Sequence, residues 1–304
     1  MAVRAAAFNQ GKFPTIAFVN LATAPLGVDL AKLVVALDKQ MQRDFVPIWG
    51  YPAKLYVTQK PKPDEWQVVF LDDADAANAL GYHDLTKDGQ PVSKVFVKTT
   101  MAAGEKVSVT ASHELLEMTI DPGAQLWAQN SNGRFHAYEM CDAVEQEVYE
   151  IDGVAVSDFV YPSFFEPWHA PRSVQFDYLK RVSQPYQTLQ KGYQIVSDGK
   201  SAQEIFGSRE KEQHFRTVEN RTMHRSEYRK QMMPGGRADV GSQAAGSDSD
   251  SRSPHAAVLH HAGKFLMALG DVVDPLPGDP FELDERRRAR RMVDPLPGGD
   301  PFEF

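Results

Sequence analysis

The 304-residue sequence contains a single cysteine, Cys141, and no long hydrophobic run. One cysteine excludes a disulfide framework within the chain, so the fold must be held by packing or by a bound metal. No stretch approaches the roughly 18 consecutive apolar residues that span a bilayer, and the first residues lack the apolar core of a signal peptide. These absences predict a soluble, cytoplasmic protein without a membrane partner.

An excess of positive charge is also missing. The chain has 33 Lys and Arg residues against 41 Asp and Glu residues, which gives a formal net charge of −8. Binding of nucleic acid depends on a basic face that neutralises phosphates, so this composition argues against a nucleic-acid partner. The one dense basic run, 286–291, is typical of a solvated tail.

Before its polar C-terminal region, the chain alternates strand-like and helix-like segments. Short apolar runs at 14–20, 53–58 and 66–71 predict strands, and the apolar spacing within 27–44 predicts a helix. The partly alternating segment 92–99 predicts a further strand, at an edge of the sheet. Together these segments predict an α+β fold with a small mixed sheet, followed by a smaller C-terminal part.

Two segments predict turns. The Asp-Gly pair at 152–153 stands between strand-like runs at 148–151 and 154–160, an arrangement typical of a β-hairpin. In the segment 81–84, we interpret His83 as a turn residue capped by the aspartate that follows it. The alternative is that His83 lines a substrate cleft.

The composition changes at about residue 209. Charged and polar residues dominate from there to 272, apart from one short helix-compatible apolar run, and such a segment cannot bury enough apolar surface to order itself. The last part holds two near-copies of one motif, VDPLPGDPFEL and VDPLPGGDPFEF. We therefore predict a domain at 1–208, a low-complexity linker at 209–272 and a disordered tail at 273–304.

The segment 107–120 contains the side chains that are suited to binding a metal. Side chains four residues apart lie on one face of a helix, so His113 and Glu117 form a pair, and Glu114 lies beside them. Most of the remaining circumference is apolar or small, which is typical of a buried helix. Burying charges without partners costs several kcal/mol each, and a shared metal ion offsets that cost. The spacing therefore predicts a divalent-metal site on a buried helix, which ends at Pro122.

The motif HELLE at 113–117 differs at one position from H-E-x-x-H, in which two histidines bind zinc and the glutamate acts as base. It resembles the active-site helix of zincin-type metallopeptidases, with Glu117 in place of the second histidine. The preceding order of elements, with an edge strand just before the helix, is also similar to a zincin N-terminal lobe. The resemblance covers about residues 10–185 and implies a zincin-like catalytic domain, in which Glu114 serves as the general base of a metal-dependent hydrolase, a peptidase.

The carboxylate of Glu117 changes what the resemblance implies. Carboxylates bind zinc, but replacing an imidazole adds negative charge, weakens the metal as a Lewis acid and favours harder ions. Zn²⁺ is the expected cofactor, with Mn²⁺ or Fe²⁺ as the alternatives. The loss of the second histidine also leaves open a catalytically inactive zincin-like module that binds metal or protein.

A third ligand must come from farther along the chain. Asp121 lies roughly 12 Å along the helix from His113, too far for a shared ion. In gluzincins, which the motif resembles, a downstream glutamate completes the site and a nearby acidic residue orients a ligand histidine. Glu139 matches the first role and Asp142 the second, and the reverse assignment stays open. Cys141 is interpreted as a small buried hydrophobe, and the alternative is that it binds a soft ion if this stretch turns inward.

The implied partner is a peptide or protein substrate, which the edge strand would bind as an extended segment. The two Pro-rich copies in the tail, each with a phenylalanine near its end, are typical of docking peptides, whose duplication raises avidity for a protein partner. A duplicated tail without a partner is the alternative.

Overall fold

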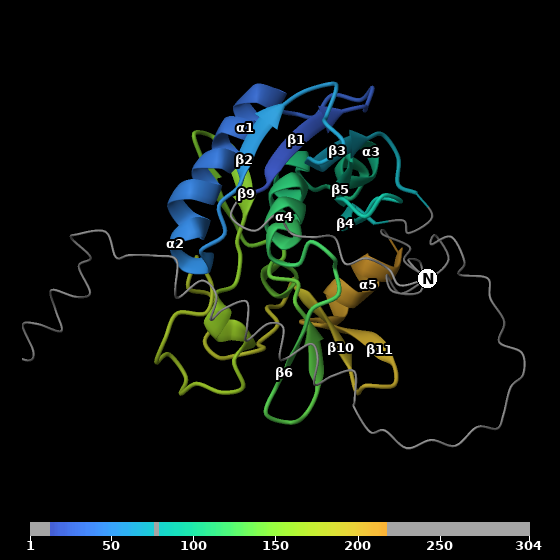
Figure 1. Ribbon diagram of the computed structural model, residues 1–304. Helices are drawn as coiled ribbons and strands as arrows, with labels where there is room; N and C mark the ends of the chain where they lie inside the picture. Colours follow the sequence, from blue (N-terminus) through green and yellow to red (C-terminus); the bar gives the residue numbers. More distant parts are fainter. Residues whose placement is uncertain (1–12, 76–78, 218–304) are drawn as a thin grey trace, which may run out of the picture. The chain divides into compact units, whose positions relative to one another are not determined.

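The computed structural model describes residues 13–75 and 79–217. Five strands form its largest sheet: β1 (Thr15–Asn20), β2 (Lys54–Val57), β3 (Trp66–Leu71), β4 (Gly81–Leu85) and β5 (Pro91–Phe96). Their order across the sheet is β2-β1-β3-β5-β4 (Figure 1). The first four strands in this order run parallel, and β4 runs antiparallel to β5. The expected mixed sheet is therefore present.

Apolar runs account for the inner strands of this sheet. Residues 16–18 of β1 have no exposed surface, which is the pattern of a strand covered on both faces. The strands predicted at 14–20, 53–58 and 66–71 are confirmed, each to within one residue at its ends.

Helix α1 (Leu30–Lys39) begins at Asp29, whose side chain accepts a hydrogen bond of 2.9 Å from the N–H three residues later. A carboxylate at this position caps a helix N-terminus. The helix continues through a π turn, η1 (Gln40–Phe45), into α2 (Val46–Trp49), and α1 packs on β2. The helix predicted within 27–44 is confirmed, although it starts later and runs farther.

Helix α4 (Val107–Ile120) carries the HELLE motif. It lies between β9 (Val154–Ser157) on one side and β4 and β5 on the other (Figure 1). Nearly all of its side chains are buried, so the prediction of a buried helix is confirmed. The helix ends before Asp121 and Pro122, as expected, and the Asp121 side chain accepts a hydrogen bond of 2.7 Å from the Leu126 N–H.

Buried polar groups fix the rotation of α4 about its axis. The Ser112 hydroxyl donates to Gln40 Oε1 (2.8 Å) and accepts from the Ser157 N–H (3.0 Å). The Gln40 amide in turn donates to the Ser157 carbonyl oxygen (2.9 Å). From β5, the Ser93 hydroxyl donates to the Glu114 carbonyl oxygen (3.0 Å). Because separating buried hydrogen-bond partners is costly, these contacts hold α4 against both of its neighbours.

The edge strand next to α4 is β4, and the prediction that 92–99 forms the edge is wrong. Strand β5 pairs with β3 on one side and with β4 on the other, and residues 97–99 belong to helix α3 (Val97–Ala102). The turn expected at 81–84 is replaced by β4. A glycine and polar residues give this segment a weak intrinsic strand preference, and its pairing with β5 and its burial against α4 override that preference.

The C-terminal half of the described chain adds two smaller antiparallel sheets. Its elements are β6 (Trp127–Gln129), β7 (Phe135–Ala137), η2 (Asp142–Val144), β8 (Val148–Ile151), η3 (Pro162–Phe165), β10 (Tyr193–Ser197), β11 (Ala202–Phe206) and α5 (Arg209–Thr217). One sheet has the order β11-β10-β7-β6, and the other is the predicted hairpin of β8 and β9. Asp152 and Gly153 have φ values of 51° and 73°, as a type I′ hairpin turn requires, so the hairpin is confirmed.

Helix α5 lies just beyond the predicted domain boundary at residue 208. Its Phe215 is buried against Tyr193 and Phe206, with ring centroids 5.1 Å apart in both pairs. The rest of the predicted linker, and the whole repeat-bearing tail predicted at 273–304, lie outside the described residues.

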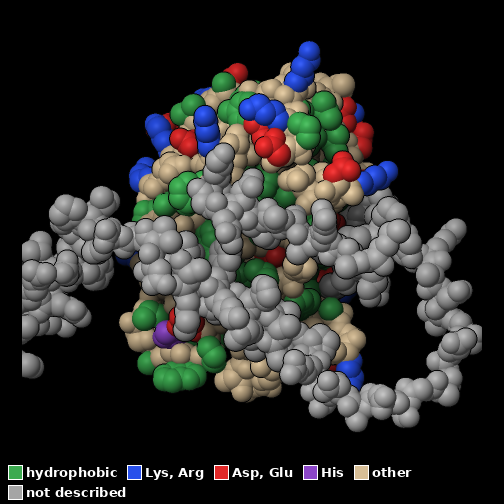
Figure 2. All heavy atoms as spheres, in the orientation of Figure 1, with side chains coloured by type: hydrophobic (Ala, Val, Ile, Leu, Met, Phe, Trp, Pro, Cys, Tyr) green, Lys and Arg blue, Asp and Glu red, His purple; other side chains and the backbone are tan. Residues whose placement is uncertain are grey.

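The described surface carries charges of both signs. In Figure 2, Lys and Arg side chains are interspersed with Asp and Glu side chains over the coloured part of the face shown. Among the helices in residues 13–75 and 79–217, none combines the length and apolarity that crossing a bilayer requires.

Candidate metal centre

Six ionisable side chains gather beside α4. Strand β4 contributes one of them, α4 contributes three, and the segment after β7 contributes two. The His113 side chain exposes 12% of its surface, and the other five expose 7% or less. We call this set the buried centre, and its members are His83, His113, Glu114, Glu117, Glu139 and Asp142.

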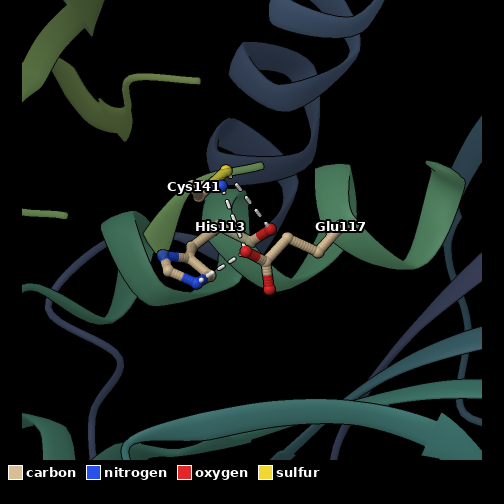
Figure 3. A group of neighbouring side chains, drawn as sticks. All are labelled: His113, Glu117 and Cys141. Carbon is tan, nitrogen blue, oxygen red and sulfur yellow. Dashed lines mark hydrogen bonds and ion pairs between the residues drawn. The ribbon is translucent and has the colours of Figure 1, made fainter. Parts of the chain in front are cut away.

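Two carboxylates of the buried centre face the same nitrogen of His113. Glu117 Oε1 lies 3.2 Å from His113 Nε2, and Asp142 Oδ1 lies 3.1 Å from it (Figure 3 shows the first contact). A ring nitrogen carries at most one hydrogen, so a single N–H cannot fully satisfy both carboxylates. The arrangement suits a cation shared by the three side chains.

His83 lies among three other carboxylate oxygens. Its Nδ1 is 3.7 Å from Glu114 Oε2, 3.7 Å from Glu117 Oε2 and 3.8 Å from Glu139 Oε2. These distances exceed the usual length of an N–H···O hydrogen bond, about 2.7–3.2 Å. With metal–ligand bonds of about 2.0–2.2 Å, the donor atoms of a tetrahedral site stand roughly 3.3–3.6 Å apart. The near-equal spacing around His83 is slightly wider than the separation of donors around one ion.

Glu117 belongs to both arrangements. Its Oε1 faces His113 and also accepts a hydrogen bond of 3.1 Å from the Cys141 backbone N–H (Figure 3). Its Oε2 faces His83. Two groups of side chains could accordingly hold a metal ion, and in each of them the donor atoms lie within 4.8 Å of one another. One consists of His113, Glu117 and Cys141, and the other of His83, Glu114 and Glu117.

The electrostatics of the buried centre favour bound protons or cations. Burial opposes protonation of the His113 ring, but the carboxylates of Glu117 and Asp142 outweigh burial and raise the pKa of His113 well above its ordinary value. Burial also raises the pKa of Glu117, and the neighbouring Asp142 and Glu139 carboxylates reinforce this effect against His113. A divalent cation that binds here must therefore displace protons.

Cys141 is fully buried, as predicted for a small apolar residue. Its thiol lies 3.8 Å from the carbonyl oxygen of His113 and donates to it. Burial raises the pKa of this thiol well above its ordinary value. The backbone N–H of Cys141 also orients Glu117 by donating to its Oε1.

The structure brings together all five residues that the sequence singled out, in an arrangement that the sequence did not specify. Asp142 contacts His113, whereas Glu139 faces His83 on the other side of Glu117. Glu114, predicted to be the general base, has its Oε2 at the same distance from His83 as Glu117 Oε2.

Sequence reasoning missed His83, which has no exposed surface. The interpretation of His83 as a turn residue is wrong because it lies in β4 and its ring faces α4. Two residues earlier, a Cβ atom at Gly81 would lie 2.8 Å from Thr110 Cγ2 and 2.9 Å from Glu114 Cγ. Alternate residues of a strand share one face, so the glycine that lets β4 approach α4 also brings His83 to the carboxylates.

The resemblance to zincins rests on the HELLE motif. A comparison of the chain with protein-family models, curated proteins and solved structures finds no match.

Proposed function

We propose that this protein is a metal-dependent hydrolase in which His83, Glu117 and Glu139 hold a divalent ion and Glu114 acts as general base. The observation that supports the proposal best is the near-equal spacing of three carboxylate oxygens, 3.7–3.8 Å from His83 Nδ1. The ligand set differs from the His113, Glu117 and Glu139 predicted from the sequence, because Glu139 lies beside His83.

The donor chemistry fits a divalent cation. One imidazole nitrogen and several carboxylate oxygens suit Mn²⁺, Fe²⁺ or Zn²⁺, and the excess of oxygen favours the harder ions. When bound, such an ion polarises a carbonyl oxygen and lowers the pKa of a coordinated water.

Glu114 is placed to move a proton within the buried centre. Its side chain exposes 7% of its surface, and its Oε2 belongs to the ring of oxygens around His83. A carboxylate in this position can take a proton from an attacking water and pass it to the leaving group. The Ser93 hydroxyl, bonded to the Glu114 carbonyl oxygen, holds the helix turn that carries this side chain.

A peptide substrate follows from the strand that supplies His83. In the described sheet, β4 pairs with β5 and is the last strand in the order, so its other side marks the sheet edge. Extended peptides bind such edges through main-chain hydrogen bonds. His113 is the most exposed side chain of the buried centre, at 12%, and it marks the side from which a substrate would arrive.

The rival function is a metal-binding module without turnover. The near-complete burial of five of the six side chains favours it, because a substrate must reach the reacting atoms.

One experiment separates the two functions. The full chain, loaded with Mn²⁺ or Zn²⁺, is incubated with a mixed peptide library, and cleavage is followed by mass spectrometry. A hydrolase should cleave peptides, and Glu114→Gln should keep its metal while turnover falls by roughly 10²–10⁴. Metal binding without cleavage would favour the binding module, and a chain that binds no metal would refute both. His169→Ala is the matched control, because His169 pairs with Glu166 outside the buried centre.

A further inference from the structure

We infer that the buried centre is binuclear: a second divalent ion is held by His113 and Asp142, and Glu117 bridges the two ions. The inference deepens the proposed function, and it rests on that proposal for the ion beside His83.

The two oxygens of Glu117 point to different partners. Oε1 lies 3.2 Å from His113 Nε2, and Oε2 lies 3.7 Å from His83 Nδ1. A carboxylate that bridges two metal ions offers one oxygen to each, and paired ions in hydrolytic sites stand about 3.5–4 Å apart. Each half of the buried centre thus has its own imidazole and its own oxygen of the shared glutamate.

Each half also has a carboxylate that faces its own histidine. Asp142 Oδ1 lies 3.1 Å from His113 Nε2, and Glu139 Oε2 lies 3.8 Å from His83 Nδ1. Donor atoms around one ion with bonds of about 2.0–2.2 Å are roughly 2.9–3.6 Å apart, depending on whether the site is octahedral or tetrahedral. The His113 side therefore has the spacing of a ligand set in its own right.

The negative charge of the buried centre also favours two divalent ions. Its four carboxylates, from Glu114, Glu117, Glu139 and Asp142, expose 7% or less of their side chains. When ionised they carry four negative charges, and burying uncompensated charge is costly. One divalent ion leaves two of these charges to be balanced by protons, whereas two divalent ions balance all four.

The Cys141 thiol is not required as a ligand. Its sulfur lies within 4.8 Å of a ligand atom of His113 and of Glu117, and it donates to the His113 carbonyl oxygen (Figure 3). With Asp142, whose Oδ1 lies 3.1 Å from His113 Nε2, as the ligand in place of Cys141, both halves are rich in oxygen and suited to the same kind of ion.

The test is the stoichiometry and magnetic coupling of bound Mn²⁺. The full chain is stripped with a chelator and titrated with Mn²⁺ alone in a calorimeter, and the bound metal is counted by elemental analysis. We expect two equivalents for the wild type and for His169→Ala, and one equivalent each for His83→Ala and His113→Ala. The low-temperature electron paramagnetic resonance spectrum of the loaded wild type should show an exchange-coupled pair.

A single equivalent in the wild type, or an uncoupled Mn²⁺ spectrum, would overturn the inference. The spectrum needs only the wild-type protein, so it can still decide the inference if a variant fails to fold. The readout is independent of turnover. Two coupled ions without peptide cleavage would uphold the binuclear centre and refute the hydrolase, and one ion with cleavage would do the reverse.

Discussion

Replacing Asp158 by asparagine should remove a large part of the pH dependence of stability. Asp158 follows β9 and has no exposed surface, and its Oδ1 accepts from the Phe159 N–H (2.7 Å) and the Leu179 N–H (3.2 Å). Burial, together with the neighbouring Asp177 carboxylate, raises the pKa of Asp158 to about 9. The folded protein therefore holds a proton here that the unfolded chain releases.

The sign and size of the pH dependence of stability follow from the proton bound at Asp158. An unfolded aspartate has a pKa of about 3.9, so between about pH 4 and pH 9 the folded state binds one more proton than the unfolded state. The raised pKa stabilises the folded state fully at pH values below the pKa of the unfolded chain, about 3.9. This stabilisation is lost as the pH rises through the pKa of Asp158 in the folded protein, about 9. The free energy of unfolding should fall by about 1.4 kcal/mol per pH unit, or about 3 kcal/mol between about pH 6 and pH 8.

Asparagine imitates the protonated acid. Its carbonyl oxygen can accept the same two backbone hydrogen bonds, and its amide is uncharged, like the protonated carboxyl group. Urea unfolding of Asp158→Asn at three pH values, followed by tryptophan fluorescence with chelator present, should give a slope against pH that is less negative than the wild-type slope. The exposed Asp88→Asn is the control and should keep the wild-type slope. Parallel slopes for wild type and Asp158→Asn would refute the reasoning.

Three further predictions concern the surroundings of the metal centre. Gly81→Ala should cost about 1–3 kcal/mol in thermal denaturation and lower the metal content, because the added methyl group would crowd Glu114 Cγ at 2.9 Å. Ser112→Ala should cost about 1–3 kcal/mol in urea unfolding, because Gln40 Oε1 and the Ser157 N–H each lose a buried partner. Metal binding should release protons and tighten as the pH rises, because the neighbouring carboxylates raise the pKa of the His113 ring. Calorimetry in two buffers of different ionisation enthalpy measures this proton release.

Each of these predictions has a contrary result. Full metal content in Gly81→Ala would show that β4 can withdraw from α4 without moving His83. A Ser112→Ala variant as stable as the wild type would mean that the polar contacts of α4 are replaced by water. Identical binding enthalpies in the two buffers would mean that the buried centre holds no displaceable proton.

The local patterns of the sequence were enough to predict much of the frame. The apolar runs of β1 and β3 and the Asp-Gly turn between β8 and β9 act within a few residues, so their structures follow from spacing and turn chemistry. The helix that bears His113, Glu114 and Glu117 was predicted for the same reason, because its apolar circumference forces burial.

The arrangement around the second histidine depends on contacts that no local pattern specifies. His83 lies in a strand that forms only because β5 pairs with it and because Gly81 lets it touch α4. The pairing of Asp142 with His113, and of Glu139 with His83, depends on how the chain after β7 returns to the helix. Glu139 and Asp142 are three residues apart and lie on opposite sides of Glu117, so their spacing alone could not assign each one to a histidine.

Diffraction from crystals soaked in Mn²⁺ tests the central claim most directly. An anomalous difference map should show density within about 2.0–2.3 Å of the side-chain donor atoms of His83, Glu117 and Glu139, with a second peak on the His113 side of Glu117. A map without a peak at the buried centre, with both histidines hydrogen-bonded directly to the carboxylates, would contradict the account.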